Sequence, residues 1–343
     1  MAAASTNPDV KLNENGVPDF DSLPLRAGDP QLSAWGLYGA SDELGFLNRQ
    51  TNERVAKAAQ TEIRTGVRPL IRRWANKYVN TNSIGLNWPL DAQKEGAFFE
   101  RKVFHQRLFN KPPRTVNDDE WTFNSQVSSQ WDGLRHFGYQ KEKLFYNGVT
   151  MEDIHSCTSH GTPSTTNGIH AWTDKGIVGR AILVDFESWR TATNKPFDHF
   201  STSAITLRDM LDCLAFQDGT TPRFGDVLLI RSGWTAALAT KSTDEIKAAR
   251  ACLPHTFGGV EQSEDVLRWI WDNFSAVAGD QPSFECWPSK KDWYMHEVLL
   301  AGWGCPIGEL FDLERLAEHC KKERRWSFFV ASEPCNVTGG VAR

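Results

Sequence analysis

The sequence predicts an α/β fold, in which a single domain forms around a central mixed β-sheet or barrel-like core flanked by helices. Residues 179–186 (GRAILVDF) and 225–234 (GDVLLIRSGW) are short apolar runs that begin with glycine and end in polar residues. Such runs are typical of strands that are buried on both faces. Stretches with helical spacing of apolar residues alternate with further strand-like runs in this half of the chain, as in an α/β domain. We therefore expect the two runs to be neighbouring strands of the central sheet.

The N-terminal part of the chain is less regular. Residues 1–30 are rich in Asn, Asp, Pro and Gly without periodicity, and they predict an arm that is loose or docked on a neighbouring chain. Residues 51–66 predict a helix with Thr51 as its N-cap and Gly66 as its stop signal. From residue 67 to about 135, proline, asparagine and glycine interrupt the pattern, so we expect long loops and short strands there.

The second half of the chain predicts further elements with no linker, repeat or low-complexity tract between them. Three segments combine helical spacing of apolar residues with acidic first turns, and two others have the character of strands. We therefore treat residues 31–343 as one domain and residues 1–30 as its arm. The predicted helices cover residues 206–217, 263–274 and 312–324, and the predicted strands cover residues 274–280 and 324–334.

Composition and charge exclude several classes of protein. No run approaches the roughly 18 apolar residues of a membrane span. The 38 Lys and Arg residues are dispersed among 43 Asp and Glu residues, which leaves no basic footprint for a nucleic acid. The seven cysteines form no C-x-x-C pair and predict buried thiols in a reducing compartment. The start shows no basic segment followed by an apolar one, so a cytoplasmic location is expected.

The stretch QWDGLRH places Asp132 and His136 four positions apart. Taken alone, it is more typical of a turn with a polar rim than of an acid/base pair. Further along the chain, His296 precedes Glu309 across a glycine-rich bend, and this spacing alone decides nothing. The sequence shows no G-x-S-x-G elbow, no P-loop and no strand followed by G-x-G-x-x-G. Serine hydrolase chemistry and a nucleotide cofactor therefore lack support.

Seven blocks of the chain, read in order, resemble a known family. They are WGLYGASDELGFLNRQT, QWDGLRH, GIVGRAILVDF, GDVLLIRSGW, AVAGDQPSFE, HEVLLAGWGCPIGELFDLERL and FFVASEPCNVTGGV. Together they resemble the cyclase family that includes bacterial kynurenine formamidase and isatin hydrolase, and their wording is most similar to its fungal branch. The resemblance spans about residues 35–340. It implies a swivelling β/β/α domain and a homo-oligomer, with a dimer expected and the arm before Trp35 best placed to reach a neighbour.

The signature of that family is H-x-G-T-H-x-D-x-x-x-H, whose first two histidines and aspartate hold a divalent metal while the last histidine transfers a proton. In this chain the aspartate falls on Asp132 and the last histidine on His136, so both are kept. The two earlier histidines fall on Gln126 and Gln130, which are departures. Gly133 is expected to let the chain bend so that Asp132 and His136 face one cavity.

The resemblance places the remaining metal ligands at His296 and Glu309, far along the chain. It also makes Trp131 and Asp280 candidates for substrate binding, although Trp131 is more typical of a side chain that packs behind the turn. We expect Asp132, His136, His296 and Glu309 to converge on one pocket, because buried carboxylates and imidazoles are costly without partners.

The two glutamines weaken the expected metal site. A glutamine carbonyl is a harder, weaker ligand than an imidazole, so the set Asp132, His296 and Glu309, with help from Gln130 and Gln126, favours Mn, Mg or Ca over Zn. The alternative is that the glutamines stand there because no metal binds. In that case Asp132, Glu309 and His136 form a hydrogen-bonded acid/base set.

Three functions remain open from the sequence. The first is an enzyme that hydrolyses an amide or lactone of a small aromatic molecule with the help of a metal, with His136 carrying the proton. The second is a metal-free cyclase, dehydratase or isomerase of fungal secondary metabolism, in which His136 and a carboxylate act as acid and base. The third is a non-catalytic family member that binds a ligand.

Overall fold

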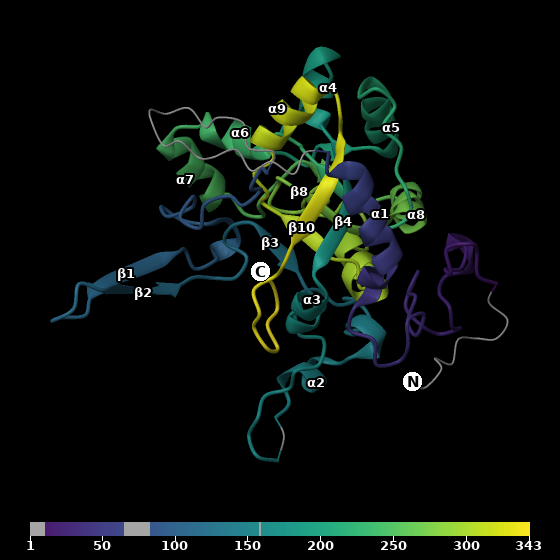
Figure 1. The fold of residues 1–343 in the computed structure, drawn as a ribbon, viewed down its shortest axis with the longest axis horizontal. Coiled ribbons are helices and arrows are strands. Elements are labelled where there is room, and N and C mark those ends of the chain that lie inside the picture. The colour runs from purple at the N-terminus through teal and green to yellow at the C-terminus, as the bar shows by residue number, and fades with distance from the viewer. Residues whose placement is uncertain (1–10, 65–82, 158) are drawn as a thin grey trace.

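The structure, a computed structural model, describes residues 11–64, 83–157 and 159–343. At its centre is a six-stranded mixed sheet with the strand order β10-β4-β6-β8-β9-β3 (Figure 1). The four inner strands run parallel, whereas β10 pairs antiparallel with β4 and β3 pairs antiparallel with β9. The mixed α/β sheet expected from the sequence is confirmed. Its strands are β3 Gln130–Asp132, β4 Ile177–Val184, β6 Asp226–Ile230, β8 Phe274–Gly279, β9 Ile307–Glu309 and β10 Ser327–Ser332.

Helices pack around this sheet, and α1 lies against β4 and β10 (Figure 1). Several begin at a hydroxyl side chain that accepts a hydrogen bond from a backbone N–H of the first turn, as Thr51, Thr206 and Ser263 do. No helix within the described residues is both long enough and apolar enough to cross a membrane. The α-helices are α1 Asn52–Glu62, α2 Met151–His155, α3 His170–Lys175, α4 Phe186–Ala192, α5 Leu207–Phe216, α6 Trp234–Ala239, α7 Thr243–Ala251, α8 Glu264–Asn273 and α9 Glu314–Glu323. Short 3-10 helices cover Phe20–Ser22, Gly45–Arg49, Phe98–Glu100 and Tyr146–Gly148, and a π-helix covers Glu297–Gly302.

Most predicted elements are found where the sequence placed them. The two apolar runs form β4 and β6, which pair in parallel, with Ile182 opposite Leu228. The three later helices are α5, α8 and α9, and the later strands are β8 and β10. The first helix, α1, ends at Glu62, and the stop signal predicted at Gly66 lies outside the described residues.

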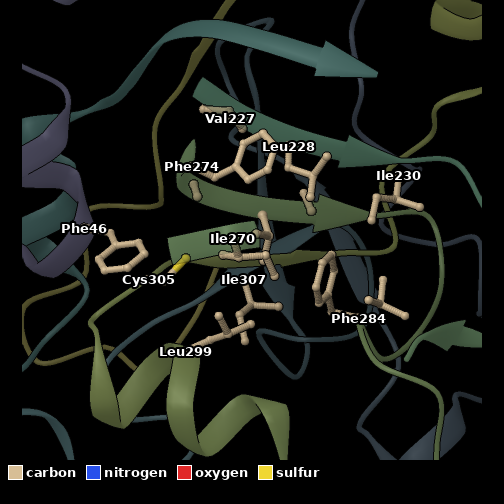
Figure 2. Close-up of a cluster of buried hydrophobic side chains, with 14 of the residues drawn as sticks. Phe46, Val227, Leu228, Ile230, Ile270, Phe274, Phe284, Leu299, Cys305 and Ile307 are labelled. Carbon is tan, nitrogen blue, oxygen red and sulfur yellow. The ribbon is translucent and has the colours of Figure 1, made fainter. Parts of the chain in front are cut away.

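The core runs without interruption across the sheet. Leu228 of β6, Phe274 of β8 and Ile307 of β9 are fully buried, and Figure 2 shows them near Ile270 of α8 and Leu299 of the π-helix. Burial of each such side chain contributes roughly 1.5–3 kcal/mol to stability. Strand β9, which carries a site residue at its end, is therefore anchored on one side by the parallel core and can support β3 on the other.

The N-terminal segment is docked on its own chain where it is described. Val17 and Phe20 are buried, and the indole N–H of Trp271 in α8 donates to the carbonyl of Pro18 at 2.9 Å. The arm expected up to residue 30 is therefore, from about residue 17 onward, a packed part of the domain and not a free extension. The first ten residues lie outside the described part of the chain.

A β-hairpin projects from the body of the molecule (Figure 1). It consists of β1 His105–Asn110 and β2 Asn117–Thr122, which pair antiparallel, and nearly all of its residues are exposed. A second small pair, β5 Ala204–Ile205 with β7 Gly259–Val260, is parallel. The two ends of the hairpin return to the core near residues 101 and 126, so the hairpin brings these two positions together.

The cysteines correct one sequence expectation. All seven are free, and Cys213, Cys286, Cys305 and Cys320 are buried as predicted, but Cys157, Cys252 and Cys335 are exposed. The three exposed thiols lie outside the helices and strands that surround the core. Their surroundings were not readable from spacing alone.

Candidate active site

Strands β3 and β9 place three polar side chains beside one another. In their antiparallel register Gln130 lies opposite Glu309, and Gln130 Nε2 donates to Glu309 Oε2 at 3.0 Å. Side chains two positions apart on a strand share a face, so Asp132 lies on the same face as Gln130. All three side chains are buried. A pairing between segments 179 positions apart thus forms the floor of the site.

His296 closes the site from the start of the π-helix. Its Nδ1 lies 2.7 Å from Glu285 Oε2, and its Nε2 lies 3.2 Å from Glu309 Oε1. Glu285 is itself fixed, because its Oε1 accepts the backbone N–H of Met295 at 2.9 Å. Burial alone lowers the pKa of His296, but the Glu285 and Glu309 carboxylates outweigh it and hold that pKa well above its usual range.

His136 faces this group from the turn after β3. Its Nε2 lies 3.9 Å from Asp132 Oδ2, and Asp132, His136 and His296 each offer a ligand atom within 4.8 Å of the others. The four residues expected to converge therefore do lie together. Gly133 was expected to allow a bend of the chain, but its backbone does not adopt a positive φ. A Cβ at this position would meet the side chain of Ile169 at 2.8 Å, so the glycine permits close packing.

The environment shifts the pKa values of Asp132 and His136 in opposite directions, and both shifts favour the neutral form. Burial, and then the Glu309 carboxylate, raise the pKa of Asp132 well above its usual range, against the opposing charges of His296 and Arg101. Burial, and then the positive charges of His296 and Arg101, lower the pKa of His136 well below its usual range. His136 is thus held neutral beside a cluster of buried carboxylates.

Gln126, expected from the sequence as a further metal ligand, has two protein partners in the structure. Its Oε1 accepts a hydrogen bond from the guanidinium of Arg101, and its Nε2 lies 2.6 Å from His136 Nδ1. Both ends of the amide are therefore engaged. The physical reason is Arg101, which also donates to the Gln126 backbone carbonyl at 2.9 Å and holds the side chain between itself and His136.

The remaining residues fit a divalent cation. Both carboxylate oxygens of Asp132 and the Oε1 of Gln130 are buried without a hydrogen-bond partner, and a cation would satisfy these acceptors. Oxygen donors with one imidazole suit Mn, Mg or Ca better than Zn. The carboxylates of Asp132 and Glu309 interact with the positive charge of Arg101, and Glu285 and Glu309 interact with that of His296.

Aromatic rings surround the two histidines. The ring of Phe137 lies 5.4 Å from that of His296 and 5.3 Å from that of Tyr294. Tyr294 is stacked on Trp287 at 5.5 Å, and Trp287 meets Phe99 edge-on at 5.9 Å. These four rings are partly exposed, unlike the carboxylates behind them. They form an aromatic rim at the solvent side of the site.

Two residues expected to bind substrate are used inside the fold. Trp131 is buried, donates its indole N–H to Ser332 Oγ at 2.9 Å and packs edge-on against Phe311. It points away from Asp132 because the two are neighbours on a strand. Asp280 is fully buried, and its oxygens accept hydrogen bonds from Ser232 and the backbone of Gly233. These contacts support the packing role for Trp131 and give Asp280 a role in holding a loop.

Sequence reasoning missed Glu285 and Arg101. Glu285 was visible only as the last residue of the block AVAGDQPSFE, with nothing beside it to mark it. Arg101 lies in the irregular region before β1 and has no local pattern. The need for such partners could be anticipated, because the buried imidazole of His296 and the buried carboxylates of Asp132 and Glu309 each require one. Which residue becomes the partner depends on the tertiary fold.

Comparison with known proteins agrees with this architecture. A crystal structure described as that of a novel cyclase aligns with a TM-score of 0.74 and 27% identity, covering 90% of this chain and 94% of its own. Isatin hydrolase A from Labrenzia aggregata, bound to benzyl benzoate, aligns with a TM-score of 0.50 and 11% identity, covering 76% of this chain and 89% of its own. Isatin hydrolase A from Ralstonia solanacearum aligns with a TM-score of 0.49 and 13% identity, covering 76% of this chain and 88% of its own. A comparison with curated proteins yields no match.

At 11% identity the isatin hydrolase from Labrenzia aggregata shows the fold alone. The family model is more specific, because it matches residues 52–286, a stretch that includes β3, β4, β6, β8 and Glu285. With that match over more than half of the sequence, the chain belongs to the family described as "Putative cyclase".

Proposed function

We propose that this protein is a metal-assisted hydrolase that cleaves an amide or lactone bond in a small aromatic molecule. The observation that carries the proposal is the group of unpartnered, buried oxygen atoms on Asp132 and Gln130, which lie beside His296 and face His136. Buried acceptors of this kind are costly without a partner. A bound cation supplies one.

Each residue has a part in that reaction. Asp132, Glu309 and His296 would hold the ion, with Gln130 as a further ligand or one water away. The ion, when bound, lowers the pKa of water and polarises a carbonyl group. His136, whose Nε2 lies 3.9 Å from Asp132 Oδ2, would act on the leaving nitrogen or oxygen of the substrate. The aromatic rim offers flat apolar surfaces on which a planar substrate can stack.

Arg101 favours a second candidate function. Its guanidinium already interacts with the charges of Glu309 and Asp132 and so supplies part of the positive charge that an ion would bring. In this alternative the protein is a metal-free cyclase, dehydratase or isomerase, in which His136 and a carboxylate act on the substrate directly.

Metal analysis separates the two candidates. Protein purified without a chelator is expected to contain about one divalent ion per chain by mass spectrometry, and to lose hydrolysis of aromatic amides or lactones on dialysis against EDTA. Isatin is a suitable first substrate, because isatin hydrolases share the fold. Metal-free protein that is fully active on its substrate would favour the metal-free enzyme. Tight ligand binding without turnover would favour a binding protein.

Two variants test the assignment of roles. His136→Ala is expected to keep the fold and the metal while lowering kcat by roughly 10²–10⁴-fold, the usual share of a proton-handling group. Asp132→Ala is expected to lose both metal and activity, because a carboxylate ligand is removed. Metal content, circular dichroism and kcat measured on the same preparations check both. Full activity in His136→Ala would reduce QWDGLRH to a polar turn.

A further inference from the structure

The side chain of Gln126 has only one orientation that its neighbours allow. A guanidinium carries hydrogen-bond donors and no acceptor, so the Gln126 atom that Arg101 contacts has to be the carbonyl oxygen. The other end of the amide is then the NH₂ group, which lies 2.6 Å from His136 Nδ1. An amide NH₂ group can only donate. His136 Nδ1 must therefore accept this hydrogen bond.

We propose that Arg101 and Gln126 are positioning residues that hold His136 in the tautomer with its proton on Nε2. A neutral imidazole has one protonated and one bare nitrogen, and the bond from Gln126 assigns the bare one to Nδ1. The N–H on Nε2 then points into the site on the side of Asp132, and Nε2 lies 3.9 Å from Asp132 Oδ2.

The hairpin explains why Arg101 can fix the orientation of the Gln126 amide. Arg101 and Gln126 stand at its two ends, where the backbone N–H of Asn124 donates to the carbonyl of Lys102 at 2.9 Å. Arg101 also donates to the backbone carbonyl of Gln126 and lies over the ring of Phe99 at 4.9 Å. The guanidinium is thus held by contacts on several sides, and the amide cannot turn without losing its bond to it.

The tautomer defines more closely what His136 does in the reaction, and this catalytic consequence rests on the proposed function. With Nδ1 occupied and Nε2 protonated, the ring can donate a hydrogen bond to an oxygen or nitrogen that gains negative charge, but it has no free nitrogen with which to accept a proton. A carboxylate in the site must then accept the proton of the attacking water and pass it to the leaving nitrogen or oxygen. His136 is then the group that stabilises the leaving atom.

The test reads the tautomer directly. In protein labelled with ¹⁵N-histidine, two-bond ¹H–¹⁵N correlations distinguish bare from protonated ring nitrogens, and the signals of His136 are assigned as those missing in His136→Ala. Wild-type protein, at one fixed neutral pH and without paramagnetic ions, is expected to show bare Nδ1 and protonated Nε2. Gln126→Glu replaces the donor by an acceptor of the same shape and is expected to move the proton to Nδ1. Gln60→Glu, the same change at an exposed position of α1, is expected to leave His136 unchanged.

A second variant protects the test against misfolding at position 126. Arg101→Met frees the amide to turn and is expected to give a mixture of both tautomers. A proton on Nδ1 in the wild type, or an unchanged pattern in both Gln126→Glu and Arg101→Met, would overturn the proposal. Failure of the proposed function is a separate outcome: protein with the expected tautomer that hydrolyses no amide or lactone would contradict the hydrolase assignment and leave the positioning role intact.

Discussion

At the scale of single residues, the imidazole of His296 is held between two carboxylates. Glu285 lies beside Nδ1 of the ring, and Nε2 is turned toward Glu309 and the space beside Asp132. A carboxylate that accepts from a ligating histidine orients the ring and strengthens it as a donor to metal. If His296 binds an ion as we propose, Glu285 would act on that ion through His296.

We predict that Glu285→Gln weakens divalent metal binding by roughly 10–100-fold, the usual effect of removing such a supporting carboxylate. The amide keeps the shape and one acceptor, so the fold should persist while the charge that polarises His296 is lost. Titration calorimetry with Mn²⁺ measures the change. Glu152→Gln, at an exposed position of α2, is the matched control. Equal affinities in both variants would show that His296 does not bind the ion.

The sequence predicted part of this site, and the limits have physical causes. Asp132, His136, His296 and Glu309 could be named because they match a motif whose residue types carry the chemistry. The contacts of Gln126 could not, because they depend on Arg101, 25 positions earlier, and on the hairpin that returns the chain between them. A hydrogen bond across such a distance leaves no mark on local spacing.

At the scale of elements, the junction between β8 and β9 is closely packed at Gly308. A Cβ at this position would lie 2.5 Å from the Cβ of Ala278 and 3.0 Å from the ring of Phe311. The residue stands between Ile307, in the core, and Glu309, in the site. The absence of a side chain at this point lets β9 approach β8 and carry Glu309 to its partners.

We predict that Gly308→Ala destabilises the protein by about 1–3 kcal/mol, because an added methyl group overpacks a filled region and shifts the strand. Gly179→Ala is the matched control, since Gly179 also lies in a strand of the same sheet but a Cβ there would meet no atom within 4 Å. Urea unfolding of both variants gives the two free energies. A Gly308→Ala protein as stable as the control would mean that β9 is free to move.

Long apolar strands were predictable and the strands that build the site were not. The β4 and β6 runs are buried along nearly all of their length, so most of their residues are apolar. Strands β3 and β9 are three residues each, too short for any periodicity, and two of the three residues of β3, Gln130 and Asp132, are polar. Polar residues in so short a strand remove the apolar pattern by which a buried strand is recognised from sequence.

At the scale of the whole molecule, exposed apolar side chains gather on the hairpin. Leu108 is 67% exposed and Trp121 is 55% exposed, whereas the segment predicted to reach a neighbour is packed on its own core from about residue 17 onward. The sequence could predict a single domain because no linker divides it. It could not predict that the polar N-terminal segment would dock, since few of its residues provide the contacts.

We predict a homodimer, as the family resemblance implies and as the prevalence of twofold symmetric assemblies favours. Light scattering coupled to size-exclusion chromatography should give twice the chain mass of 38.7 kDa at micromolar concentration. A dilution series to the nanomolar range controls for weak self-association at high concentration. A mass of one chain at micromolar concentration would contradict the prediction.

The pairing of β3 with β9 has a consequence for how the protein acquires its activity. The two halves of the site are 179 positions apart, so none of its chemistry exists while the ribosome is still adding the residues between them. Contacts between such distant segments form slowly, because the entropy cost of closing a long loop of chain precedes the stabilising contacts. Strands β4, β6 and β8 all precede Glu309 in the sequence. A chain in which β9 has not yet paired with β3 therefore lacks the complete candidate site, even where those three strands have already formed.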